Sequence, residues 1–211
     1  MLDLYTWMTP NGRKISIMLE EIGMPYRVHA VDIARNEQFL PEFLAIAPNN
    51  KIPAIVHETD GRRIALMESG AILIYLADVS GQLLPTDARR YEVLQWLMWQ
   101  MAGFGPMLGQ AHHFLRYAPG KSEYAEQRFI DEVRRLYGVL DAQLARHAFV
   151  AGDDYTIADI AIWPWASRHE WHRVDLTAYP NVLRWYRTVA ARPAVQRGYH
   201  IPSKVNEIPL P

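Results

Sequence analysis

Four consecutive residues near the start of the chain, Thr9, Pro10, Asn11 and Gly12, include two side chains suited to stabilising an anion, those of Thr9 and Asn11. They follow a short alternating segment and precede a run with helical spacing, which predicts a strand-to-helix turn. The start of a helix offers free backbone N–H groups and the positive end of its dipole. A small-molecule thiol there would need a pKa depression of only about one or two units to be largely ionised at neutral pH. The Thr9 hydroxyl and the Asn11 amide could supply it, although either residue could instead serve only to cap the helix.

The dipeptide Ile52–Pro53 follows the loop residues Asn49, Asn50 and Lys51 and opens an apolar strand. A cis peptide bond at this position would leave the Ile52 backbone available to an extended peptide ligand. The alternative is a strand that tolerates proline among its first residues. The dipeptide alone does not decide between them.

Glu68 and Ser69 stand directly before an apolar helix. The Ser69 hydroxyl and the following N–H groups suit a carboxylate, and Glu68 suits an adjacent ammonium group. An α-amino acid moiety presents both groups together. Capping of the helix by Ser69 is the alternative, and it gives Glu68 no role.

The chain has 211 residues and no cysteine. This composition excludes structural disulfides, thiolate metal sites and a protein thiol as the nucleophile. Lys and Arg number 22 against 23 for Asp and Glu, so charge predicts neither nucleic-acid nor membrane binding. His112 and His113 would point about 100° apart on a helix, so we expect no metal site. No apolar run has the length of a membrane span, and we expect a cytoplasmic protein.

Strand and helix patterns alternate through the first part of the chain. Their βαβαββα order predicts an α/β domain of thioredoxin type over residues 1–80. Tyr5 lies inside the first predicted strand, and we interpret it as structural. Gly81, Pro85 and Thr86 mark a linker over residues 80–87. The predicted strands cover 2–5, 26–31, 52–56 and 64–67, and the predicted helices cover 15–22, 39–46 and 69–76.

Strand patterns nearly vanish after the linker, which predicts an all-α domain over residues 88–211. Three glycines and Pro106 within 103–109 predict a kink in the first long helix. Thr156 and Asp159 have the spacing of a capping box. The Pro-rich segment from His200 to Pro211 is expected to be an extended tail. The predicted helical stretches cover 88–117, 122–147 and 182–191.

Taken together, these motifs resemble those of the glutathione transferases. More narrowly, the chain resembles the Nu-class bacterial enzymes that act as glutathione-dependent disulfide-bond oxidoreductases, and the resemblance runs from Leu2 to about residue 195. The segments that carry it are Thr9–Gly12, Pro48–Pro53, Glu68–Ile72, Gln95–Gln100, Gly105–Gln110 and Tyr155–Ile160.

The resemblance implies that glutathione is the co-substrate and that Thr9 and Asn11 are the catalytic residues, which stabilise its thiolate. It implies that the Ile52 backbone pairs with the cysteinyl unit and that Glu68 and Ser69 bind the γ-glutamyl end. Arg128 would reach in from the second subunit of a homodimer. The full implied set of glutathione-binding residues is Asn11, Gln38, Lys51, Ile52, Pro53, Glu68, Ser69 and Arg128.

The implied activity is reduction of small disulfides, accompanied by some peroxide reduction and weak conjugation to electrophiles. One alternative is a conventional glutathione transferase that acts on electrophiles. Another is a non-catalytic module that keeps the fold for protein recognition, as the related yeast nitrogen-regulation protein suggests.

Overall fold

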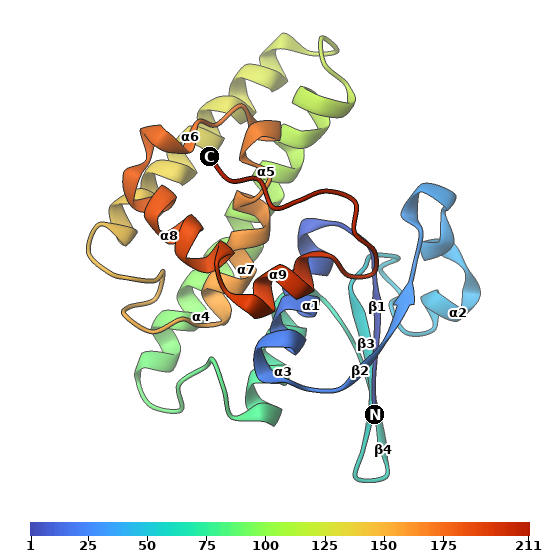
Figure 1. Ribbon diagram of the computed structural model, residues 1–211. Helices are drawn as coiled ribbons and strands as arrows, with labels where there is room; N and C mark the ends of the chain where they lie inside the picture. Colours follow the sequence, from blue (N-terminus) through green and yellow to red (C-terminus); the bar gives the residue numbers. More distant parts are fainter. The chain divides into compact units, whose positions relative to one another are not determined.

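The computed structural model describes residues 1–211 and divides into two compact units (Figure 1). The first unit contains Met1–Leu84 and Ala191–Ile208, and the second contains Pro85–Ala190 and Pro209–Pro211. This division differs from the expected one chiefly at Ala191–Ile208, which the sequence assigned to the helical domain. That segment packs instead with the first unit.

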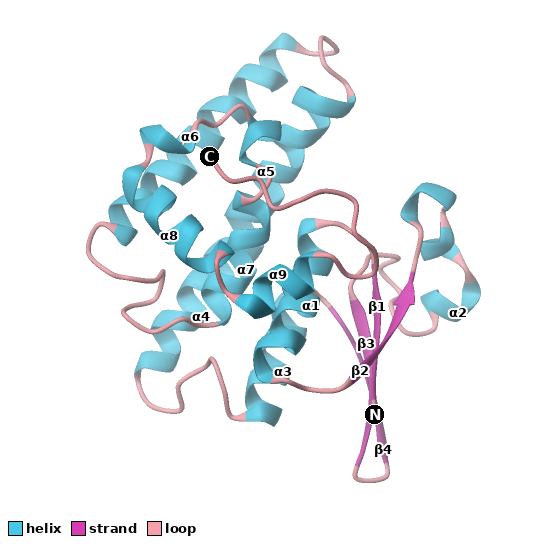
Figure 2. Cartoon of the chain, in the orientation of Figure 1, coloured by secondary structure: helices cyan, strands magenta, loops and turns pink.

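A mixed four-stranded sheet in the order β2-β1-β3-β4 forms the centre of the first unit (Figure 2). Strand β1 pairs in parallel with β2 and antiparallel with β3, and β3 pairs antiparallel with β4. The strands and their helices confirm the expected thioredoxin-like fold. They are β1 (Leu2–Thr6), α1 (Pro10–Ile22), β2 (Tyr26–Ala30), α2 (Pro41–Leu44), β3 (Ala54–Thr59), β4 (Arg62–Met67), α3 (Ser69–Ser80) and α9 (Pro193–Tyr199).

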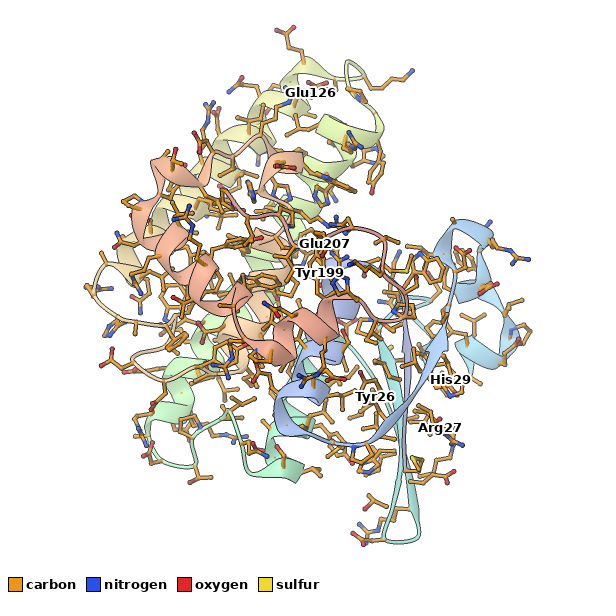
Figure 3. The ribbon with its side chains drawn as sticks, viewed as in Figure 1. Tyr26, Arg27, His29, Glu126, Tyr199 and Glu207 are labelled. Carbon is orange, nitrogen blue, oxygen red and sulfur yellow. The ribbon has the colours of Figure 1, made fainter.

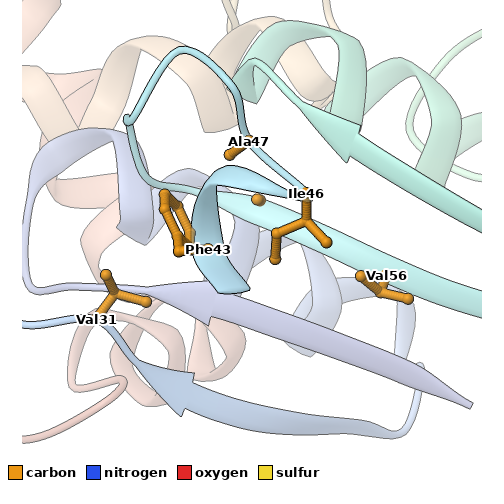
Figure 4. Packing of buried hydrophobic residues seen from close by; sticks show 6 residues of the cluster. Val31, Phe43, Ile46, Ala47 and Val56 are labelled. Atoms are coloured by element: carbon orange, nitrogen blue, oxygen red, sulfur yellow. The ribbon is translucent and has the colours of Figure 1, made fainter. Parts of the chain in front are cut away.

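Both faces of the sheet are covered, which explains why most residues of β1 and β3 are buried. Helices α1 and α3 pack together on one face (Figure 1). On the other face, the segment that contains α2 packs on β3 through an apolar cluster (Figure 4). Tyr5 packs against this cluster and stacks on His29 with 4.6 Å between ring centroids, as expected for a structural residue. The cluster consists of Val31, Phe43, Ile46, Ala47, Ala54 and Val56.

Helix α9 was not expected from the sequence, which places Pro193 after the last predicted helix. In the structure Pro193 instead occupies the first turn of a new helix, where its missing N–H costs nothing. Its last residue, Tyr199, is fully buried (Figure 3).

Helix α9 packs closely along α1. The Ser16 hydroxyl donates to the Gly198 carbonyl at 2.7 Å. A Cβ at Gly198 would lie 2.7 Å from Ile17 Cα, so only glycine permits this approach. These contacts explain why the segment after Ala190 belongs to the first unit.

The second unit is all-helical, as expected. The predicted kink is present as a π-helical segment, Gln100–Phe104, which separates two helices of the long stretch. No helix of the chain combines the length and the apolar character that crossing a bilayer requires. The elements of the unit are α4 (Arg89–Trp99), α5 (Gly105–His112), a second π-helical segment (His113–Tyr117), α6 (Glu123–Leu144), α7 (Ile157–Ala166) and α8 (Pro180–Ala190).

The predicted capping box at the start of α7 is confirmed. The buried Asp159 carboxylate accepts hydrogen bonds from Thr156 N at 3.0 Å, Thr156 Oγ1 at 3.2 Å, Val150 N at 2.9 Å and Trp185 Nε1 at 2.8 Å. Burial raises the pKa of Asp159 to about 6, against the opposing effect of these donors. One side chain therefore joins α7, α8 and the turn at Val150.

We expect Asp159→Ala to lower the free energy of unfolding by about 3 kcal/mol, because it leaves several buried donors without an acceptor. Urea denaturation followed by circular dichroism measures this loss. Asp175→Ala is the matched control, since Asp175 accepts from Thr177 N at 2.9 Å at an exposed turn. A similar shift in midpoint for both variants would contradict the structural importance of Asp159.

Candidate active site

Thr9 is the N-cap of α1, and its Oγ1 accepts a hydrogen bond from Gly12 N at 3.1 Å. The capping alternative is therefore realised. It does not exclude the chemical role, because a hydroxyl that accepts one hydrogen bond can still donate its own hydrogen. Thr9 is only half-buried, which leaves this donor within reach of a ligand.

The beginning of α1 also has the electrostatics that an anion needs. The helix is 13 residues long and has no acidic residue in its first turn, so the helix itself places no carboxylate at the positive end of its dipole. Asn11 lies in this turn and is half-buried, like Thr9. A carboxamide, a hydroxyl and the helix dipole thus meet at one helix start.

Gly12 allows the start of α1 to lie directly against the end of β1. A Cβ on this residue would lie 2.2 Å from the Trp7 carbonyl oxygen and 2.5 Å from Thr6 Oγ1. Thr6 is the buried last residue of β1 and Trp7 follows it directly, so the backbone oxygen of Trp7 cannot move aside cheaply. Glycine at this position therefore fixes the loop that carries Thr9.

The peptide bond between Ile52 and Pro53 is cis. Pairing of β3 with its neighbours begins at Ala54, opposite Tyr5 and Met67, so Ile52 lies before the paired residues. The Ile52 side chain packs against the apolar cluster beneath α2. The residue is held in place by its side chain, with its backbone at the end of the sheet.

Glu68 has a positive φ of 69° at the N-cap of α3, a conformation that non-glycine residues adopt at an energetic cost. The carboxylate is exposed and accepts from Asn49 Nδ2 at 3.5 Å. The alternative that Ser69 is the cap is wrong, because Ser69 is already the first residue of the helix and Glu68 forms no side-chain cap. Neither predicted residue caps α3 with its side chain.

Lys14 is a site residue that the sequence analysis missed. It is 1% exposed, and its Nζ donates to Ser69 Oγ at 3.2 Å. Burial lowers the pKa of Lys14 to about 7, although the negative charge of Glu68 opposes this shift. One signal was present in the sequence, since Lys14 shares the i, i+4 face of α1 with the apolar Met18.

The other predicted residues are placed separately. Gln38 lies in the turn Glu37–Phe39, and its Oε1 is buried without a hydrogen-bond partner. Lys51 is exposed and Pro53 is buried. Arg128 belongs to the second unit, where it lines an open hollow of about 570 Å³ on α6. The first unit thus carries every predicted residue except Arg128, and the binding roles of all of them stay predictions.

The two adjacent histidines have different surroundings, as the helical geometry predicted. His112 is buried and stacks on His172 with 4.4 Å between ring centroids, and its burial lowers its pKa to about 4. His113 is exposed. No group of three or more His, Asp or Glu side chains in the chain is arranged to hold a metal ion.

A thioredoxin-like sheet is followed by a helical unit, and helix α1 has no acidic residue in its first turn. This combination is typical of a class of proteins that bind thiols. The chain belongs to the glutathione S-transferase family. The model of the N-terminal domain of this family matches residues 9–79, and that of the C-terminal domain matches residues 97–193.

Three relatives illustrate the similarity. The chain is 48% identical to the disulfide-bond oxidoreductase YfcG of Escherichia coli, over 92% of each chain. It is 46% identical to a glutathione transferase of Burkholderia graminis solved with two glutathione molecules per subunit, with a TM-score of 0.91 over 97% of this chain and 89% of that one. It is 45% identical to a Pseudomonas putida glutathione transferase solved with one glutathione disulfide per subunit, with a TM-score of 0.91 over 96% and 92% of the two chains.

We expect Gly12→Ala to lower the free energy of unfolding by about 1–3 kcal/mol, because the added methyl group overlaps the Trp7 carbonyl. Chemical denaturation measures the change. Gly138→Ala in α6 is the control, since a Cβ there meets nothing within 4 Å and should stabilise the helix by up to about 1 kcal/mol. Equal effects of the two substitutions would refute the close packing at Gly12.

Proposed function

We propose that this chain is a glutathione-dependent disulfide-bond oxidoreductase, with possible peroxidase and weak conjugating side activities. The observation that carries the proposal is the start of α1. It combines the Thr9 hydroxyl, the Asn11 carboxamide and a first turn without acidic residues, and the chain has no cysteine of its own. The site is built to stabilise a thiolate, and the thiolate must come from a ligand.

Glutathione fits the remaining predicted residues by its chemistry. The cysteinyl unit pairs with the backbone of Ile52, next to Pro53. The γ-glutamyl end presents an ammonium group to Glu68 and a carboxylate to Ser69. Lys51 and Gln38 bind the remaining parts of the tripeptide. Arg128 contributes from the second subunit of a homodimer.

The reaction consists of two thiol–disulfide exchanges. The bound glutathione thiolate attacks one sulfur of the substrate disulfide, forms a mixed disulfide with it and expels the other half as a thiolate. A second glutathione thiolate then attacks the glutathione sulfur of this mixed disulfide and expels the remaining half. Two glutathione molecules are oxidised to glutathione disulfide, and the substrate is reduced to two thiols.

The named activity of YfcG and the ligands of the two solved relatives support this proposal. One of those relatives holds two glutathione molecules and the other holds glutathione disulfide, the reactant and product of this scheme. A requirement for reduced glutathione also fits the cytoplasm, where the glutathione pool is kept reduced.

Asn11→Ala should lower kcat/KM for a model disulfide with glutathione about 10- to 1000-fold, because it removes one hydrogen-bond donor to the bound glutathione thiolate. The ultraviolet absorbance of bound thiolate, followed against pH, should show a raised pKa of the glutathione thiol. The exposed carboxamide of Gln82, at the far end of α3, provides the control variant Gln82→Ala. Wild-type rates in Asn11→Ala would contradict the role of Asn11.

The same preparation distinguishes the alternatives. Faster turnover of an aryl halide than of the disulfide would favour a conventional transferase. Calorimetry that detects no glutathione binding would favour a non-catalytic recognition module.

A further inference from the structure

Lys14 is among the largest side chains that are fully buried in the chain, and it lies one helical turn after Asn11. Taking an ammonium group out of water is costly unless a partner or a function compensates it. Its Nζ lies 3.2 Å from the Oγ of Ser69, the first residue of α3. Lys14 therefore connects the start of α1 with the residue proposed to bind a carboxylate.

The direction of this hydrogen bond determines what Ser69 can do. An ammonium group has three donors and no acceptor, so Ser69 Oγ must be the acceptor when Lys14 is charged. The hydroxyl hydrogen of Ser69 then points to a different acceptor. A neutral amine has a lone pair, and Ser69 could then turn its hydrogen inward to Lys14.

We propose that Lys14 is a positioning residue for the γ-glutamyl carboxylate of glutathione, because it orients the Ser69 hydroxyl as a donor and places a positive charge behind it. This inference rests on the proposed function, since it concerns the same ligand. Lys14 acts through Ser69 and need not contact the carboxylate itself.

The charges around Lys14 favour a coupling between binding of the ligand carboxylate and protonation of Lys14. Glu68, at the start of α3, is the carboxylate that acts on Lys14, and burial lowers the pKa of Lys14 to about 7 in the absence of ligand. On the other elements that pack against α1, Asp3 of β1 is held by Arg27 and His29.

The remaining titratable groups near α1 are engaged elsewhere. Arg197 of α9 pairs with Glu20, and Tyr75 of α3 pairs with His57. Asp78 lies more than two turns along α3 from Ser69 and is exposed. A ligand carboxylate at Ser69 would add a negative charge close to Lys14 and raise its pKa, against the opposing effect of the ligand ammonium group at Glu68.

The decisive experiment is calorimetry with S-methylglutathione, which keeps the carboxylate and has no titrating thiol. If the carboxylate raises the pKa of Lys14 by about one unit, the wild-type protein takes up about 0.4 proton on binding at pH 7, measured in two buffers of different ionisation enthalpy. Lys14→Met should bind about tenfold more weakly at pH 6 and within about twofold of wild type at pH 8.5, with no proton uptake.

Two controls isolate the carboxylate. With an analogue in which γ-aminobutyrate replaces the γ-glutamyl residue, wild type and Lys14→Met should bind alike. The exposed Lys121, in the second unit, gives Lys121→Met, which should keep the wild-type pH profile. In turnover, Lys14→Met should raise KM for glutathione and leave kcat nearly unchanged.

A Lys14→Met protein with the wild-type pH profile and proton uptake would overturn the inference. If Lys14→Met does not fold, Ser69→Ala takes its place and should abolish the proton uptake, and uptake that persists in it would equally overturn the inference. A wild-type protein that binds no S-methylglutathione would instead refute the proposed function, so the two failures are distinguishable.

Discussion

Helix α1 buries three polar side chains, Arg13, Lys14 and Ser16, and the rest of the first unit depends on how they are satisfied. Arg13 donates to the Tyr199 carbonyl at 3.0 Å and lies 3.5 Å above the Tyr199 ring. Ser16 donates to Gly198, and Lys14 donates to Ser69. Buried polar groups that lose their partners cost several kcal/mol, so α1 cannot shift without α3 and α9. The start of α1, which carries Thr9 and Asn11, is therefore fixed by two elements distant in sequence.

The same constraint explains the course of the chain after α9. Asn206 accepts from Arg13 at 3.5 Å and donates to the Tyr199 hydroxyl at 3.2 Å, which draws the tail back over the helix (Figure 3). On the way, the Ser203 hydroxyl lies 3.6 Å from Met8 Sδ, directly before Thr9 in sequence. The extended tail expected from its prolines is thus present as an ordered part of the first unit as far as Ile208. Its contacts place it against the loop of the site.

Local patterns predicted the alternating elements, the capping box and the kink, because each depends on residues a few positions apart. The sequence did not predict α9, since a proline after a helix signals its end as well as the start of the next one. It also missed Lys14, because a lysine on a helix is usually exposed, and its burial depends on Ser69, 55 residues away. The roles of Thr9, Asn11, Glu68 and Ser69 were predicted from their positions before helices and stay predictions. The hydrogen bond from Lys14 to Ser69, which links the two helices, comes only from the packing of α1 on α3. The role of Arg128 requires a second subunit, and no pattern within one chain can establish it.

Because the chain has no cysteine, any thiolate that the start of α1 stabilises must belong to a ligand. A protein with its own cysteine could lower the pKa of that thiol by placing it at the helix start alone. Here the sulfur arrives on a ligand, so the protein must hold that ligand by groups distant from the sulfur. Asn11 and Lys14 are three residues apart on one helix, about 4.5 Å along its axis, and we propose that they act on the thiolate and the carboxylate of the same tripeptide. In this proposal a single rigid helix carries both the groups that stabilise the thiolate and the group that strengthens binding of the γ-glutamyl end, so the two are positioned together.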